Sequence, residues 1–563
     1  MKLPLLLSIQ AAAVSANPLD LFRRQAQATV TVTVPTSSTS NNLFPTSPEI
    51  FPGNTATGAP AGLAQTNPVN GYGLPNATQS YVAPNPLVTN EIIVDNTNNI
   101  NIARNWGNLS PYEPAPGFGV EEYALPAQCS IKQVHILHRH GARYPTADAS
   151  TAGLAIALKN ATNASFTGPL SFLNGFTYKL GAEILVPVGR QQLFDSGVQA
   201  SYQYKYLYNT SAPKIVARTT SQDRILKSAE YWLAGFFGFE WSDYANLEVI
   251  IEGTGFNNSL ASYDTCANNN KPATLTASGV MSAWENIYLR QALTRLQANT
   301  KGFNWTIPLV YAAQQMCPYE TVALGYSAFC QLFTAAEWQG FEYSVDISFE
   351  QGGGLGSAQG RASGIGYVDE LIDRITNMMP NSTIEGVNKT LDLNSTFFPL
   401  GQTIYFDATH DIDISYTLAA LGLSQFGAVL PSTGPPANQQ FIASNLVPFG
   451  ARLITEVISC STPINAQHLP VTSGNSTGNT TYIHLSANQR TIPFGASFSV
   501  CGNRADGWCE LNNFLAAEAN RTTLAEYNFS CFGNYSVSAN ITDGRPYSKR
   551  SSIPLEKFDE LYL

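Results

Sequence analysis

The residues best suited to chemistry lie in the heptad 139–145, Arg-His-Gly-Ala-Arg-Tyr-Pro, where one histidine stands between two arginines. A guanidinium is a planar fork of donors that fits phosphate oxygens, and two of them can hold an anion beside an imidazole. The ring of His140 could then attack phosphorus and form a phosphohistidine. The heptad therefore predicts phosphoryl chemistry, with His140 as nucleophile and with Arg139 and Arg143 as phosphate ligands.

The heptad follows an apolar run, residues 133–138, which reads as a β-strand that ends before Gly141 and Pro145. Open α/β sheets bind ligands at the carboxyl ends of their strands. We therefore expect the heptad to form a loop at such an edge.

Two later segments repeat the order of strand, polar turn and helix. In residues 214–236 the predicted turn carries Arg218, and in residues 403–422 it carries His410 and Asp411. The carboxyl ends of parallel strands share one edge, so these side chains are expected to meet the heptad there.

These motifs resemble the histidine acid phosphatases, the branch of the phosphoglycerate-mutase-like superfamily that includes secreted fungal phytases and acid phosphatases. The resemblance extends to Asn-Trp-Gly at 105–107, Ser-Pro-Tyr at 110–112 and Gly-Tyr-Val-Asp-Glu-Leu at 366–371. It implies a three-layer α/β/α core with a mostly helical lobe inserted at about residues 150–205 and 255–350. The active site would lie in the cleft between them.

The resemblance also implies roles for the later turns. Arg218 and His410 would bind phosphate, and Asp411 would protonate the leaving alkoxide and then act as base when water hydrolyses the phosphoenzyme. Fixed cations would supply the charge of a metal ion, so no metal or cofactor is expected. Asp407 and Asp413 are alternatives for the acid but are more typical of turn and cap positions.

Asp411 must be protonated before the first step, whereas a free aspartate titrates near 3.9. Partial burial and the phosphate dianion are expected to raise its pKa, which predicts an acidic optimum at roughly pH 3–6.

Three alternatives compete with this interpretation. His135, His138 and His140 could bind a metal, but the interleaved guanidiniums would repel a divalent cation. A phosphoryl-transferring mutase would share the histidine but usually carries a glutamate as the acid. A catalytically dead, glycosylated cell-wall or binding protein on the same scaffold would not need His140, the three arginines and Asp411.

The composition predicts a secreted glycoprotein. Residues 1–16 resemble a signal peptide, and sixteen Asn-x-Ser/Thr sequons, Asn108 among them, indicate N-glycans. The pair Arg23-Arg24 is either a processing site or an unprocessed surface pair. A net charge of −10 without a basic block argues against nucleic acid or a membrane surface as partner, and a homo-oligomer is compatible with the sequence.

The chain divides by composition into four parts. A low-complexity arm at 17–98, which we expect to be disordered, follows the signal peptide. The catalytic region then covers 99–545, and a polar tail covers 546–563.

Eight cysteines in a secreted chain predict disulfides, although they allow roughly a hundred pairings. Local spacing favours Cys317–Cys330 and Cys501–Cys509. The resemblance adds two long-range pairs, Cys129–Cys460 and Cys266–Cys531.

Substrate preference is the least determined property. A site dedicated to phytate should carry extra basic residues, yet none follows the heptad before Lys159. Thr409-His410-Asp411 also resembles the broad-specificity enzymes more than the Ser-His-Asp form of specialised phytases. We predict a general acid phosphatase for small phosphomonoesters, with phytate (myo-inositol hexakisphosphate) as a candidate substrate and a dedicated 3- or 6-phytase as the alternative.

Overall fold

A computed structural model describes residues 100–271, 277–471, 479–537 and 541–546. The predicted signal peptide, the predicted arm and all but the first residue of the predicted tail lie outside the described residues. Within these residues no helix is both long and apolar enough to cross a membrane.

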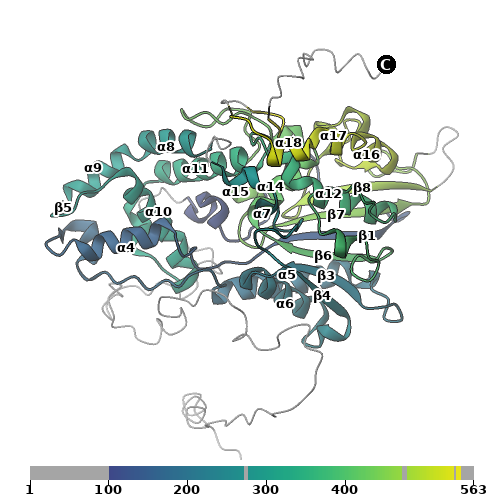
Figure 1. Cartoon of the computed structure of the whole chain (residues 1–563), viewed down its shortest axis with the longest axis horizontal. Helices are drawn as coiled ribbons and strands as arrows, with labels where there is room; N and C mark the ends of the chain where they lie inside the picture. Colours follow the sequence, from purple (N-terminus) through teal and green to yellow (C-terminus); the bar gives the residue numbers. More distant parts are fainter. Residues whose placement is uncertain (1–99, 272–276, 472–478, 538–540, 547–563) are drawn as a thin grey trace, which may run out of the picture. The chain divides into compact units, whose positions relative to one another are not determined.

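A single mixed sheet of eight strands, counted over the described residues, organises the fold (Figure 1). The strand order is β10-β8-β7-β1-β6-β3-β4, and β9 pairs with β8. Strands β1, β6, β3 and β4 run parallel, whereas β7 pairs antiparallel with β1. The bounds are β1 Cys129–Arg139, β3 Ile215–Thr220, β4 Ala245–Ile250, β6 Ile404–Thr409, β7 Arg452–Cys460, β8 Thr480–Ala487, β9 Arg490–Thr491 and β10 Cys509–Glu510.

Helices cover both faces of this sheet, which confirms the predicted three-layer core. Helices α5 (Pro187–Tyr204) and α6 (Asp223–Phe237) lie on one face, and α12 (Gly360–Thr376) and α14 (Asp411–Ala420) lie on the other (Figure 1). Every residue of β6 is buried, as expected for a strand covered on both sides.

A group of helices lies beyond the end of the sheet (Figure 1). It contains α4 (Ser150–Asn160), α8 (Ala277–Tyr288), α9 (Arg290–Ala298), α10 (Ile307–Leu324) and α11 (Ala335–Gly353), with α10 packed on α4 and α11 packed on α8. The two-residue strands β2 (Ser165–Phe166) and β5 (Thr300–Lys301) pair with each other in this region.

The predicted helical insertion at 150–205 extends too far. Helix α5 belongs to the core, because it packs on α6 and its side chains reach the sheet. Ser196 bonds His138 of β1 and Arg452 of β7, and Tyr204 donates a 2.7 Å hydrogen bond to Glu456 of β7. The contacts that decide this placement come from residues far away in the sequence.

The remaining helices are short, and one of them reaches the site. The 3-10 helix η5 (Gly107–Leu109) is held by α11, whose Glu342 accepts a 2.6 Å hydrogen bond from the backbone N–H of Gly107.

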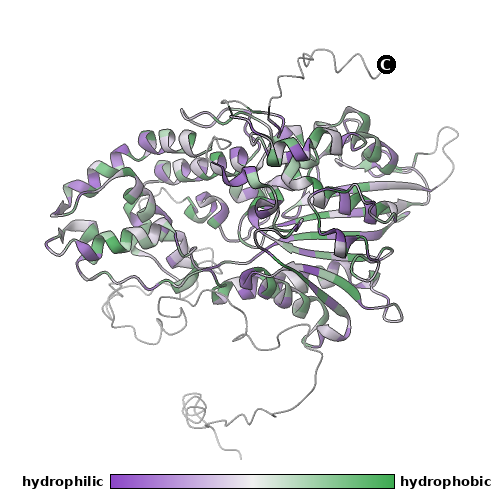
Figure 2. Cartoon of the chain, in the orientation of Figure 1, coloured by the Kyte–Doolittle hydropathy of each residue, from purple (hydrophilic) through white to green (hydrophobic). Residues whose placement is uncertain are grey.

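Figure 2 shows hydrophobic and hydrophilic residues interspersed along the helices and strands, as expected for amphipathic elements. The other short α-helices are α7 Ser262–Thr265, α13 Lys389–Asp392, α15 Ala443–Leu446, α16 Leu511–Ala517, α17 Arg521–Ala525 and α18 Tyr527–Phe532.

All four predicted disulfides are present. Cys129–Cys460 joins directly opposed positions of β1 and β7, and Cys266–Cys531 joins the segment after α7 to α18. Cys317–Cys330 and Cys501–Cys509 close short loops.

Candidate active site

The carboxyl ends of four parallel strands bring the site together. Arg139, the last residue of β1, is paired in register with Thr409, the last residue of β6. His140 therefore follows one strand and His410 follows the next, and their rings lie 5.9 Å apart between centroids. This confirms the expected meeting of the heptad with the His-Asp turn.

The heptad loop is fixed by its neighbours. The backbone N–H of His140 donates to the carbonyl of Thr409, and that of Gly450 donates to the carbonyl of His140. A Cβ at Gly141 would stand 2.1 Å from the carbonyl oxygen of Gly189 in α5, so this position requires glycine. The close approach of α5 holds the loop against the sheet.

The hydrogen bonding and the surroundings of the His140 ring determine which of its nitrogens carries a proton. Its Nδ1 lies 2.8 Å from the carbonyl of Gly141, so this nitrogen carries the proton and the lone pair remains on Nε2. Burial, followed by the charges of Arg139, Arg143 and Arg224, holds the pKa of His140 well below its usual 6.5. Both effects favour the neutral imidazole over the imidazolium.

Arg139 is fully buried and connects the two motifs. Its Nη1 donates to the carbonyls of Asn108 and of Val447, the latter at 2.7 Å. Its Nη2 lies 2.5 Å from Oδ2 of Asp411, and the side-chain amide of Asn108 donates to the same oxygen at 2.9 Å. Asn108 thus positions both charged groups, although the sequence indicated only a sequon there.

The pKa of Asp411 differs from the sequence-based expectation. Burial raises it, but Arg139, the amide of Asn108, Arg143 and His410 together outweigh burial and lower the pKa to about 2. The carboxylate is ionised because it stands among fixed cations.

Arg143 and Arg224 add two further cations. Arg143 donates from Nη1 to the carbonyl of Tyr144, and Arg224, in the first turn of α6, pairs with Glu183 at 2.8 Å. The buried Nε atoms of Arg139, Arg143 and Arg224 have no hydrogen-bond partner among the described residues. Clustered donors of this kind suit a bound anion.

The structure contradicts the prediction that Arg218 binds phosphate. Strand β3 continues to Thr220, so Arg218 lies inside the sheet rather than in the turn. Its guanidinium is directed at carboxylates, with Nε 2.6 Å from Asp407, Nη2 2.6 Å from Glu370 and Nη1 3.6 Å from Asp392. Arg224, six residues later, lies near His140 instead.

The two alternative acids also have structural partners. Asp407 bonds Arg218 and Arg374 at 2.6 Å each, which places it in the same buried cluster. Asp413 accepts hydrogen bonds from the backbone N–H and the hydroxyl of Ser262. Neither carboxylate is placed beside Arg139 as Asp411 is.

His410 is held by two residues that the sequence analysis missed. Its Nε2 lies 2.9 Å from the carboxylate of Glu252 and 3.2 Å from the hydroxyl of Tyr263, and this hydroxyl also donates to Glu252. Glu252 follows the end of β4 by two residues. Its sequence signal was an apolar run, Val-Ile-Ile at 249–251, ended by a polar residue and glycine.

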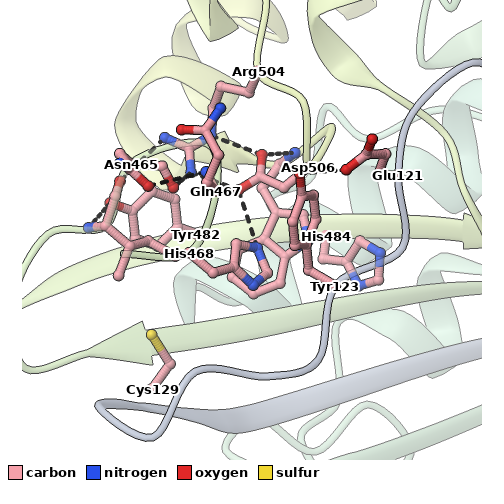
Figure 3. A network of polar contacts seen from close by, with 12 residues as sticks. Glu121, Tyr123, Cys129, Asn465, Gln467, His468, Tyr482, His484, Arg504 and Asp506 are labelled. Atoms are coloured by element: carbon pink, nitrogen blue, oxygen red, sulfur yellow. Dashed lines mark hydrogen bonds and ion pairs between the residues drawn. The ribbon is translucent and has the colours of Figure 1, made fainter. Parts of the chain in front are cut away.

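The other four histidines have partners away from this site. The ring of His135 stacks on Tyr405, and both nitrogens of His138 are engaged, by the carbonyl of Arg139 and by Ser196. The ring of His468 contacts those of Tyr123 and Trp508. Its Nε2 lies 3.1 Å from Asp506, which also pairs with Arg504 (Figure 3). His484 bonds Glu456 and Thr491. These contacts give each ring a packing or hydrogen-bonding role.

Comparison with known protein families gives a match over most of the described chain. The model of the histidine phosphatase superfamily (branch 2) matches residues 130–488, which include His140, Arg224, Glu252 and Asp411. Asn108 lies outside the matched residues.

Similar proteins come from several fungi. The chain is 32% identical over 448 residues to phytase A of Emericella nidulans, covering 75% of this chain and 90% of that protein. It is 29% identical over 465 residues to the thiamine-repressible acid phosphatase pho4 of Schizosaccharomyces pombe, covering 77% and 92%. The crystal structure of the phytase from D. castellii superposes with a TM-score of 0.62 at 25% identity, covering 78% of this chain and 89% of that one.

Proposed function

Since the chain belongs to branch 2 of the histidine phosphatase superfamily, we propose that it hydrolyses phosphomonoesters through a phosphohistidine on His140. The observation that carries the proposal is a neutral imidazole with its Nδ1 proton bound to the Gly141 carbonyl, placed among three arginines. Such a ring has a free lone pair in acid and an anion-binding environment around it.

In the proposed first step, Nε2 of His140 attacks phosphorus while the ester oxygen leaves with a proton from Asp411. Arg139, Arg143, Arg224 and His410 bind the phosphoryl oxygens and stabilise the charge that develops on them. In the second step, Asp411 removes a proton from water, which attacks the phosphohistidine and releases inorganic phosphate.

Asp411 gains its proton when substrate binding weakens its salt bridge with Arg139. A phosphate dianion competes with Asp411 for that guanidinium and adds negative charge beside the carboxylate. Both effects raise the pKa of Asp411 from its low value. An acidic optimum is therefore expected, because His140 stays neutral in acid while Asp411 gains its proton only there.

For substrate and location, we propose a secreted enzyme with broad specificity that also accepts phytate. The phytase and acid phosphatase relatives support this range of substrates. Four disulfides suit an oxidising compartment. We expect N-glycans on sequons other than Asn108, because the amide of Asn108 is bonded to Asp411.

One set of assays tests the proposal. Hydrolysis of p-nitrophenyl phosphate and phytate is measured at about pH 3–6, the expected range, for the wild type and for His140→Ala, each with and without a chelator. We expect activity on both substrates that survives chelation and falls by about 1,000-fold or more in the variant.

Brief incubation with labelled substrate, followed by a neutral or alkaline quench, should leave label on His140 of the wild type. An active His140→Ala enzyme, or a wild type whose label never attaches to this ring, would contradict the mechanism. Loss of activity with chelator would instead support a metallohydrolase.

A further inference from the structure

The pair formed by Glu252 and His410 has a geometry that the proposed mechanism does not yet use. The side chain of Glu252 is 1% exposed and that of His410 is 4% exposed, and their charged atoms lie 2.9 Å apart. The hydrogen bonds of His410 to Glu252 and Tyr263 both engage Nε2. Nδ1 is the remaining ring nitrogen, and it is therefore the one available to a phosphoryl oxygen.

Glu252 is an ionised acceptor in this arrangement. Burial raises its pKa, but the charge and hydrogen bond of His410 and the hydroxyl of Tyr263 outweigh burial and lower the pKa to about 2. Burial raises the pKa of Tyr263, so the phenol stays protonated and donates to Glu252. The carboxylate is thus held in place from two sides.

We propose that Glu252 is a positioning residue for His410: its carboxylate binds the Nε2 proton, directs Nδ1 toward the substrate phosphate and stabilises the ring as an imidazolium between two anions. This inference rests on the proposed function, because the second anion is the phosphate. A neutral imidazole that accepts at one nitrogen donates only one proton, whereas the imidazolium donates to Glu252 and to phosphate together. His410 then adds a full positive charge to the three arginines.

Several other ionisable groups face this pair, and they determine what a test must control. Among the described residues, Glu252 is the carboxylate that is hydrogen-bonded to the ring of His410. The other groups act on the pair through space, from α7, α14, α6 and the heptad: Asp264, Asp411, Asp413, Arg224 and His140.

The test measures binding of inorganic phosphate by titration calorimetry on the full chain, at about pH 4.5 and about pH 6.5, on either side of an ordinary histidine pKa. Glu252→Gln keeps the size and an acceptor oxygen but removes the charge. We expect phosphate to bind about tenfold more weakly than to the wild type at the higher pH, as for a lost charge-assisted hydrogen bond. A lower pH favours the protonated form of any imidazole, so the loss should be less than about threefold there.

The matched control is Asp264→Asn, which removes a negative charge from the same neighbourhood without removing a bond to the ring. Its phosphate affinity should stay within about twofold of the wild type at both pH values. If Glu252→Gln does not fold, Tyr263→Phe replaces it, because it removes the donor to Glu252 and should show the same pH pattern at about a third of the size.

An affinity within twofold of the wild type at both pH values, or an equal loss at both, would overturn the inference. Phosphate binding is an equilibrium measurement and does not depend on turnover. A wild type that binds phosphate but never forms a phosphohistidine would therefore refute the proposed function alone. An active phosphatase whose Glu252→Gln variant binds phosphate normally would refute only the role of Glu252.

Discussion

The molecule buries two groups of arginines whose surroundings differ. In the interior cluster, Arg218 and Arg374 are bonded by Asp407, and Glu370 and Asp392 complete a set of carboxylates around Arg218. In the strand-end cluster, defined as Arg139, Arg143 and Arg224, Arg139 faces Asp411, Arg224 faces Glu183, and Arg143 bonds a backbone carbonyl.

The pKa values of the arginines show the same contrast. Burial lowers the pKa of Arg218, but Asp407 and Glu370 outweigh it and raise the value well above the usual one. For Arg139, burial outweighs Asp411, and the neighbouring arginines act in the same direction, so the pKa falls to about 10. Burial alone therefore does not identify a binding arginine. The informative feature is positive charge that the protein itself leaves uncompensated.

The largest expected effect comes from breaking the interior cluster. Asp407→Asn keeps the shape of the side chain but leaves two buried guanidiniums without their shared anion. We expect the free energy of unfolding to fall by about 3–5 kcal/mol, as when one partner of a buried ion pair is removed. Urea unfolding at about neutral pH measures this change. A loss below about 1 kcal/mol would show that the interior cluster is not held by its carboxylates.

The second prediction concerns the strand-end cluster and distinguishes the role of Arg224 from that of Arg218. Arg224→Gln removes a cation from a region with excess positive charge, so the free energy of unfolding should change by no more than about 1 kcal/mol. We expect kcat/KM for p-nitrophenyl phosphate to fall about 100-fold, as for the loss of one donor to a transition-state oxyanion. Steady-state kinetics and urea unfolding of the same sample measure the two quantities. An unchanged kcat/KM would return Arg218 to consideration as the phosphate ligand.

The smallest expected effect is an additional loss of stability at acidic pH. The folded-state pKa of Asp411 is about 2, below the value near 3.9 of an unfolded aspartate, so its contribution is complete above about pH 4 and is lost as pH falls toward 2. Between about pH 4.5 and 2.5 the wild type should therefore lose about 1–2 kcal/mol more than Asp411→Asn does. Denaturant unfolding of both proteins at the two pH values measures the difference. Equal losses would mean that Arg139 does not hold the carboxylate ionised in the folded state.

The depressed pKa of His140 explains how an acid enzyme could use a histidine nucleophile. An ordinary imidazole would be protonated at about pH 4 and could not attack phosphorus. Burial of the ring opposes this protonation, and the positive charges of the strand-end cluster oppose it further. The cations that we propose as substrate ligands therefore add to the effect of burial, which favours the neutral ring.

The sequence by itself determined where the motifs proposed to carry the chemistry lie along the chain. Arg139 ends a strand and His140 and Arg143 follow it, while His410 lies between β6 and its helix and Asp411 begins that helix; a strand end is local information. The resemblance to known phosphatases added the layered core and the long-range disulfides. The predicted site positions depend on short sequence motifs at the ends of strands.

Only the tertiary structure decided which charges face one another. Arg218 and Arg224 are six residues apart in the same strand-turn-helix segment, and a strand longer by two residues moves one of them into the interior cluster. The partners that define Asn108 and Glu252 come from residues 303 and 158 positions away. Sequence patterns locate an ionisable side chain on its own element, whereas its charge state and role depend on groups that folding brings beside it.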